Sequence, residues 1–518
     1  RVEQQLGPLA KFSYPIDDSM LTVSQIRGAT PSPDGRRLVF AALDRLWIAD
    51  LPADSASAAG PPAVIRNARR LTTGDAVEHA PAWSPDGQYI AYVTWNDSTG
   101  GDIHRVRADG RSRPERLTRR SAFYDRISYS RDGSRLVAVR GSKLHRLRML
   151  EDFGSHGGAA ELEYVWLPAA GGDVNRIAWV GAGPTQQGRN APHIGPDPER
   201  IYFWAGADGL QSMRFDGTDV RTIVKVTGPV VSDFRPGTRP AQPDEVLISP
   251  DGERALVRVT GNVYLITVPL AGGSEAPTVS VTTRSSVPTR RLTRIGGDFV
   301  GWRPDGSGAY YSIGRSFFRY DLARADRLVG DSVTQARAAT ARAPADSARR
   351  DSPSASSGAK MGPVYEASRA DVEIVVAKDR PKGTVVLSGA RIITMKGDEV
   401  IPVGDIVVRD NRIAAVGAKG AVAIPSGATV VDVTGKTILP GYVDIHAHTW
   451  VAWGVHRRQV SQFLAQLAYG ITTQRDPQTS SEDFMSYSDL METGDLIGPR
   501  LFSTGPGVFS SAGIASLD

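Results

Sequence analysis

The chain has 518 residues, 41% of them hydrophobic and 23% charged, which is enough for two or three globular domains. Its 61 lysines and arginines nearly balance its 56 acidic residues, and a net charge of +5 is too weak to indicate a nucleic-acid partner. The sequence has no cysteine, so a metal ion would have to bind histidine and carboxylate side chains. This composition suits a periplasmic or secreted protein. No apolar run is long enough to predict a membrane span.

A turn motif recurs at intervals of 46 to 65 residues, each time just before a strand-like run. Its copies are Ser32-Pro33-Asp34-Gly35, Ser84-Pro85-Asp86-Gly87, Ser130-Arg131-Asp132-Gly133, Ser249-Pro250-Asp251-Gly252, Arg303-Pro304-Asp305-Gly306 and a degenerate sixth, Gly195-Pro196-Asp197-Pro198. Proline presets φ, aspartate bonds its own backbone and glycine takes the left-handed conformation, so the motif joins adjacent antiparallel strands. Aromatic residues upstream (Trp83, Tyr129, Trp302) are expected to pack between neighbours. The period predicts a six-bladed all-β propeller over residues 22–328.

The rest of the chain divides by composition. Residues 1–21 fit no complete blade, and we expect a ring-closing strand or the remnant of an upstream domain. Residues 329–362 are rich in Ala, Ser, Arg and Pro, which predicts a flexible linker. Residues 363–440 contain short strand-like runs broken by Gly and Pro, which predicts a small β-sandwich. Residues 441–518 alternate strand and helix, with helices expected at 457–469 and 481–493, as in the opening of a parallel α/β unit.

Two histidines end the first strand of this α/β pattern, in Asp444-Ile445-His446-Ala447-His448. Side chains alternate along a strand, so Asp444, His446 and His448 are expected on one face, where the imidazoles converge. A His-x-His pair alone is more often a surface feature, but the preceding Leu439-Pro440-Gly441 makes it a candidate metal site.

The other histidines and two neighbouring motifs were weighed against ordinary structural roles. His456 is expected to face solvent, and the propeller histidines are expected to be surface or turn residues: His79, His104, His145 and His193. Arg475-Asp476 ends the second strand, where a functional role and a structural ion pair are both open. Trp450 and Trp453 either line a pocket or pack the barrel rim.

The turn motifs, with Arg-Leu-Thr triplets at 70–72, 116–118 and 291–293, resemble the TolB-like, WD40-like family of six-bladed propellers. The later part resembles the amidohydrolase superfamily, in its imidazolonepropionase and prolidase branch. The residues that carry this second resemblance are Gly383–Leu387, Asn411–Ile413, Asp432–Lys436, Leu439–Gly441, Asp444–His448, Gly470–Asp476 and Gly498–Phe502. A propeller ahead of such a hydrolase is a known combination.

This resemblance implies that a TIM barrel follows the sandwich and that its first strand supplies His446 and His448 as ligands of a divalent metal, usually zinc, with one or two ions bound. Asp444 would lie behind the ligands as a supporting or structural group, and Arg475 and Asp476 are further candidates for a supporting role because of their place at a strand end. Family members take a lysine, further histidines and an acidic base from later strands, so the catalytic residues are expected beyond Asp518. We therefore expect an incomplete barrel, completed by the remainder of a longer protein or by a second chain.

The expected activity is metal-dependent hydrolysis of a C–N bond in an amide, cyclic amide or short peptide by a metal-activated water, with the propeller gating access or adding a binding surface. The partners would then be a small-molecule or short-peptide substrate, with homo-oligomerisation left open. The alternative is a peptide- or protein-binding propeller with a vestigial hydrolase half. No Gly-x-Ser-x-Gly motif accompanies the propeller, which counts against a serine hydrolase.

Overall fold

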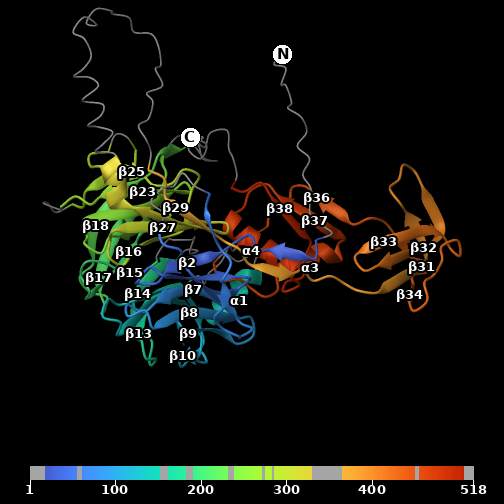
Figure 1. Ribbon diagram of the computed structural model, residues 1–518, viewed down its shortest axis with the longest axis horizontal. Helices are drawn as coiled ribbons and strands as arrows, with labels where there is room; N and C mark the ends of the chain where they lie inside the picture. Colours follow the sequence, from blue (N-terminus) through green and yellow to red (C-terminus); the bar gives the residue numbers. More distant parts are fainter. Residues whose placement is uncertain are drawn as a thin grey trace, which may run out of the picture.

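The computed structural model of the protein describes residues 18–54, 61–151, 161–182, 191–231, 239–270, 275–282, 285–328, 365–449 and 454–506. A β-propeller lies at one end, a parallel α/β unit lies beside it, and a five-stranded sheet projects at the far end (Figure 1). No helix in these ranges is long and apolar enough to cross a bilayer.

Six sheets form a ring, and each begins with its innermost strand. Blade one contains β2 (Arg27–Pro31), β3 (Arg37–Ala42), β4 (Arg45–Asp50) and β6 (Arg69–Arg70). Blade two contains β7 (Val77–Trp83), β8 (Tyr89–Asn96), β9 (Gly100–Arg107) and β10 (Glu115–Arg116). Blade three contains β11 (Phe123–Tyr129), β12 (Arg135–Gly141), β13 (Glu161–Pro168) and β14 (Asn175–Ala182), with helix α1 (Lys143–Glu151) after β12.

The second half of the ring repeats this plan. Blade four contains β15 (His193–Ile194), β16 (Arg200–Trp204), β17 (Leu210–Arg214), β18 (Arg221–Thr227) and the added strand β24 (Thr278–Ser280), with a 3-10 turn at Gly206–Asp208. Blade five contains β21 (Glu245–Ile248), β22 (Arg254–Val259), β23 (Asn262–Thr267) and β25 (Thr289–Arg291), after the small ribbon of β19 (Val230–Val231) and β20 (Arg239–Pro240). Blade six contains β26 (Asp298–Trp302), β27 (Gly308–Ile313), β28 (Ser316–Asp321), β29 (Ser368–Val372) and β5 (Ala63–Ile65). Strand β2 contacts both β7 and β26, so the ring is closed and the predicted six blades are present.

The repeated turns connect the first two strands of a blade as predicted. In blade one the Ser32 hydroxyl donates to Asp34 Oδ1 at 2.5 Å and accepts the Arg37 N–H at 2.9 Å, while Gly35 has a φ of +69°. The aromatic residues upstream link neighbouring blades through their indole N–H groups: Trp83 donates to the Thr30 carbonyl and Trp302 to the Leu247 carbonyl.

The last blade is completed by a strand from beyond the predicted propeller. Strand β29 pairs antiparallel with β28, although its sequence lies within residues 363–440, where we expected a sandwich. Strand β5, from the outer connection of blade one, then pairs parallel with β29. The N-terminal strand β1 (Met20–Thr22) is not part of a blade; it pairs with β30 (Val375–Ala377). Residues 1–17 and the predicted linker at 329–362 lie outside the described residues.

Four innermost strands carry a bulge at equivalent places. The bulge residues, Gly28, Ala80, Arg126 and Phe299, have φ between +51° and +57°, and the ladder register shifts at each one. A bulge bends its strand and re-aims the neighbouring side chains. All four bulge residues line one pocket of the propeller, together with Gly454 and Glu482 from the α/β part of the chain.

The predicted sandwich is a single five-stranded sheet in the part of the chain that the structure describes. Its strands are β31 (Thr384–Ile393), β32 (Val400–Arg409), β33 (Arg412–Ala418), β34 (Thr429–Asp432) and β35 (Thr437–Ile438). Its buried core consists of Ala390, Ile392 and Ile406, whereas Ile413 and Val430 are exposed. One sheet cannot cover both of its faces, so apolar side chains of a sandwich pattern remain at the surface.

The parallel α/β unit was correctly predicted. Its elements are β36 (Tyr442–Asp444), α3 (Ser461–Ala468), β37 (Ile471–Asp476), α4 (Ser481–Glu492) and β38 (Arg500–Ser503). All three strands run parallel, with β37 in the centre, and Phe463, Tyr487 and Leu490 bury the helices against the sheet. Helix α3 begins four residues later than predicted because residues 454–460 run along the propeller instead.

Candidate metal centre

His446 and His448 lie immediately beyond the carboxyl end of β36. The expected continuous strand was wrong in this detail: β36 ends at Asp444, whose Oδ1 accepts the backbone N–H of His446 at 3.0 Å and so turns the chain. The two imidazoles still lie close, with ring centroids 5.1 Å apart and planes at 80°. His446 is exposed and His448 is about one-third exposed at 32%. The pair therefore faces solvent at the strand end.

Asp476, the last residue of β37, holds the loop that follows β36 through a hydrogen bond to its backbone. Its carboxylate is buried, accepts the N–H groups of Thr449 at 2.5 Å and Gln478 at 2.8 Å, and lies 3.8 Å from His448 Nδ1. The neighbouring Arg475 is exposed, so the two residues of this motif point to different environments. Gln474, also buried, donates to the Thr449 hydroxyl at 2.7 Å. The ends of β36 and β37 are thus joined through Asp476 and Thr449.

The donor chemistry fits half of a zinc site. Two neutral imidazoles are favoured zinc ligands, and the Asp476 carboxylate lies beside one of them at 3.8 Å, which is longer than a hydrogen bond. No set of three or more metal-binding side chains is assembled among the residues that the structure describes. Trp450 and Trp453, the aromatic candidates, fall outside those residues. The structure thus brings together His446, His448 and Asp476, while Asp444 shapes the turn.

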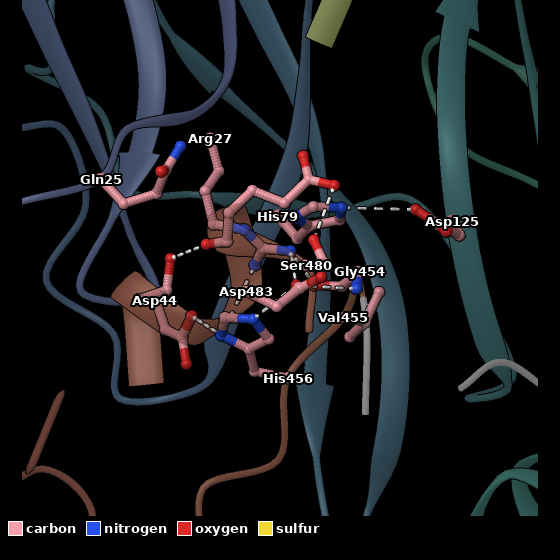
Figure 2. A network of polar contacts seen from close by, with 12 residues as sticks. Gln25, Arg27, Asp44, His79, Asp125, Gly454, Val455, His456, Ser480 and Asp483 are labelled. Carbon is pink, nitrogen blue, oxygen red and sulfur yellow. Dashed lines mark hydrogen bonds and ion pairs between the residues drawn. The ribbon is translucent and has the colours of Figure 1, made fainter. Parts of the chain in front are cut away.

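The loop after this half-site enters the propeller, and here the expectation for His456 was wrong. His456 is completely buried, with Nδ1 2.7 Å from Asp44 Oδ1 and Nε2 3.1 Å from Asp483 Oδ1 (Figure 2). Arg27 donates to Asp483 at 2.8 Å and to the Gly454 carbonyl at 2.7 Å. Burial alone would raise the pKa of Asp44, but His456 and Arg27 outweigh it and hold that pKa below its usual value. We call Arg27, Asp44, His456 and Asp483 the junction cluster.

Further contacts extend the junction over three blades. Arg146 is fully buried on α1, donates to the Val455 carbonyl, and places its guanidinium 5.0 Å from the centre of the Phe123 ring. Burial lowers the pKa of Arg146 to about 10. Arg457 pairs with Asp97 at 3.2 Å. His79 was also misjudged, because it is buried in β7 and lies 3.6 Å from Asp125 Oδ1 (Figure 2). Spacing along the chain gives no signal for either buried histidine, since their partners are distant in sequence.

Asp489 at this junction should make stability depend on pH. Burial raises its pKa to about 6, and Oδ2 accepts the Ser24 N–H at 2.7 Å. The folded state therefore holds this proton more tightly than the unfolded chain, and stability is lost as pH rises from about 4 to about 6. Asp489→Asn keeps an acceptor and should raise the free energy of unfolding at pH 7 by about 2 kcal/mol, with no gain at pH 4. Urea denaturation of both proteins between pH 4 and pH 7 measures this difference, and the exposed Asp495→Asn is the control. A gain in stability of the same size at every pH would contradict the raised pKa of Asp489.

Together these features define a β-propeller joined to a parallel α/β unit that carries a histidine pair. No protein-family model matches the chain. An adenine deaminase from Paracoccus denitrificans is 34% identical over 88 residues, which are 17% of this chain and 14% of that protein. The chain thus spans about one seventh of the length of the curated relatives that it matches.

Two solved structures show partial likeness. TolB from Acinetobacter baumannii is 14% identical with a TM-score of 0.32, and the match covers 57% of this chain and 60% of that one. A candidate prolidase from Bifidobacterium longum is 28% identical with a TM-score of 0.21, over 24% of this chain and 30% of that one.

Proposed function

We propose that the α/β unit is part of a metal-dependent hydrolase centre that cleaves C–N bonds in amides, cyclic amides or short peptides. The observation that carries this proposal is the pair His446 and His448 at the carboxyl end of the first of three parallel strands, where α/β enzymes place their catalytic groups. The segment shared with adenine deaminase supports it, because removal of an amino group breaks a C–N bond.

The residues of the chain would have separate tasks in this centre. His446 and His448 would hold the metal, and a zinc ion bound there would supply a water with a pKa near 7 as the nucleophile. Asp476 would keep the His448 ring oriented, because its buried carboxylate is itself fixed by two backbone N–H groups. Asp444 would hold His446 in place through the turn.

Further polypeptide would complete the site, since catalytic zinc usually has three protein ligands. Parallel sheets are normally covered on both faces, yet the side chains of Val443 and Ile445 are 61% and 70% exposed, and Phe502 is 38% exposed. This apolar surface supports the proposal that the remainder of a barrel, or a second chain, packs on β36 and β38. A periplasmic or secreted location is part of the same proposal and is supported by the absence of cysteine.

The second candidate is a peptide- or protein-binding propeller whose hydrolase half is vestigial. It is favoured by a pocket of about 480 Å³ in the propeller channel, a volume within the usual size range of ligand pockets. The two candidates differ in one measurable respect, because only the hydrolase requires metal for its function.

Metal removal tests the proposal. The natural full-length protein, loaded with zinc, should hydrolyse members of a panel of N-acyl amino acids, cyclic amides and dipeptides. Dialysis against a chelator should abolish this activity, and added zinc should restore it, because the nucleophile depends on the metal. Full activity in demonstrably metal-free protein, or no hydrolysis of any panel member by zinc-loaded protein, would overturn it.

A further inference from the structure

The propeller channel is closed at one end by the α/β unit. Gly454 and Glu482 line it together with the innermost strands of the blades. We call this closed end the floor; it contains Arg27, His79, Arg126, Glu245, Arg258 and Glu482. The opposite end is bordered by the turn residues Pro33, Pro85, Pro250 and Pro304, and aromatic side chains line the wall between: Trp83, Tyr129, Trp302 and Tyr310. The wall is therefore largely apolar and aromatic, while both ends carry charged side chains, with Arg131 and Arg303 among the turn residues of the opposite end.

Within the part of the chain that the structure describes, the arginines of the floor have ion-pair partners, whereas its glutamates do not. Its arginines are already paired: Arg27 with Asp483 at 2.8 Å, Arg126 with Asp125 at 3.5 Å, and Arg258 with Asp298 at 2.6 Å. Among the described residues, the two carboxyl groups that line the channel have no cation within ion-pairing distance: Glu245 and Glu482. Both side chains are at least nine-tenths buried, and Glu482 receives one hydrogen bond, from the Ser480 hydroxyl at 3.2 Å. Burial raises the pKa of Glu482 well above its usual value and that of Glu245 to about 7, so without a ligand these carboxyl groups tend to keep their protons. A cation beside a buried carboxyl stabilises its charged form, so the pair favours a cationic group.

His79 gives a second, independent indication of a ligand at this point. It is 5% exposed and lines the same floor, and its Nδ1 has no hydrogen-bond partner. Burial and the nearby Arg27 and Arg126 hold the pKa of His79 well below its usual value, so the ring is neutral. With Nε2 directed at Asp125 at 3.6 Å, the free Nδ1 is an acceptor. A ligand that donates N–H groups would satisfy it.

We propose that the propeller channel binds the free amino terminus of a short peptide, with the ammonium group at the floor that Glu245, Glu482 and His79 line and the following residues along the aromatic wall. An ammonium group supplies three N–H donors to a floor where His79 Nδ1 has no hydrogen-bond partner and Glu482 accepts from Ser480, and it brings a cation that can pair with the two glutamates. Aromatic faces and prolines suit apolar side chains behind it. The inference goes beyond the proposed hydrolase, because a binding site in the propeller requires no metal.

The test is calorimetric titration of metal-free full-length protein with two peptides that differ only at the amino terminus. The probes are Ala-Phe-Ala amide and N-acetyl-Ala-Phe-Ala amide, at pH 7.5. The free amine should bind, and acetylation should weaken binding about tenfold or more, since it removes a charge-assisted hydrogen-bond donor. Equal or tighter binding of the acetylated peptide, or no binding of either at millimolar concentration, would overturn the proposal. This comparison uses the unmodified protein, so it does not depend on a variant that folds.

A pH series and a pair of variants locate the site. Glu245 faces Arg126, Arg258 and Asp244, and burial raises its pKa to about 7. Affinity for the free amine should therefore be greatest near pH 7.5 and fall on both sides, as Glu245 gains a proton below about 7 and the peptide amine loses one above about 8. Glu245→Gln should weaken binding about tenfold, whereas exposed Glu253→Gln should not change it. An equal loss in both variants, or no loss in Glu245→Gln, would contradict the assigned position.

Discussion

Replacing Arg27 with leucine should lower the free energy of unfolding by about 3–5 kcal/mol, the usual cost of breaking a buried ion pair by removing one partner. Arg27 is 3% exposed and binds both Asp483 and the Gly454 carbonyl. Leucine fills similar space but leaves two buried carboxylates, Asp44 and Asp483, to share His456. Chemical denaturation followed by tryptophan fluorescence measures the loss.

A surface ion pair provides the matched control for this experiment. Arg66 pairs with Glu373 at 3.0 Å, but its side chain is 68% exposed, so Arg66→Leu should change stability by less than about 0.5 kcal/mol. If Arg27→Leu were equally harmless, the junction cluster would not hold the α/β unit to the propeller. Limited proteolysis should also cleave Arg27→Leu protein faster between the two parts.

The double substitution of His446 and His448 by alanine should remove zinc from the full-length protein and abolish hydrolysis. Loss of a supporting partner already costs roughly 10–100-fold in metal affinity, and here two direct ligands are removed. His446 is exposed and His448 is about one-third exposed, so the fold should remain intact. Metal content after dialysis and hydrolysis of the substrate panel are the two measurements.

His145→Ala is the control for the histidine pair, because this residue lies on α1 of the propeller and outside the half-site. It should retain both metal and activity. Zinc content that is unchanged in the double variant would show that the metal binds elsewhere. Retained zinc with lost activity would instead assign the pair a role in substrate binding, and either result would contradict the proposed ligand set.

The propeller could be predicted from the sequence because the residues that form each turn and its strands are close together in the chain. Each Ser-x-Asp-Gly turn contains its own hydrogen bonds, as Ser32 and Asp34 show, and the repeat spacing then fixes the number of blades. The parallel α/β unit could be predicted for the same reason, since its strand and helix patterns alternate within residues 442–503. The position of the histidine pair followed from the same pattern, although the turn made by Asp444 did not.

What the sequence did not reveal depends on contacts between distant residues. His456 is buried because Asp44, 412 positions earlier, approaches it to 2.7 Å. His79 is likewise buried because the propeller blades surround it, and its neighbour Asp125 comes from the next blade. The strand Ser368–Val372 could not be assigned to blade six, because its partner β28 precedes it by a long stretch of unrelated composition. In each case the local sequence indicated the residue or the strand, but it could not indicate the distant residues that contact it.

The way the ring closes means that the propeller and the segment that follows it are not separable modules. A protein ending at residue 328 would lack β29, so β28 would become an open edge of blade six and β5 would lose its partner. It would also lose the residues that close the channel. A recombination event that replaced the later part of the chain would therefore have to join the new segment after residue 377, the end of β30. The new segment would also need a loop and a helix that fit the propeller, as residues 454–460 and α4 do. We expect the two parts to have changed together, as one inherited unit.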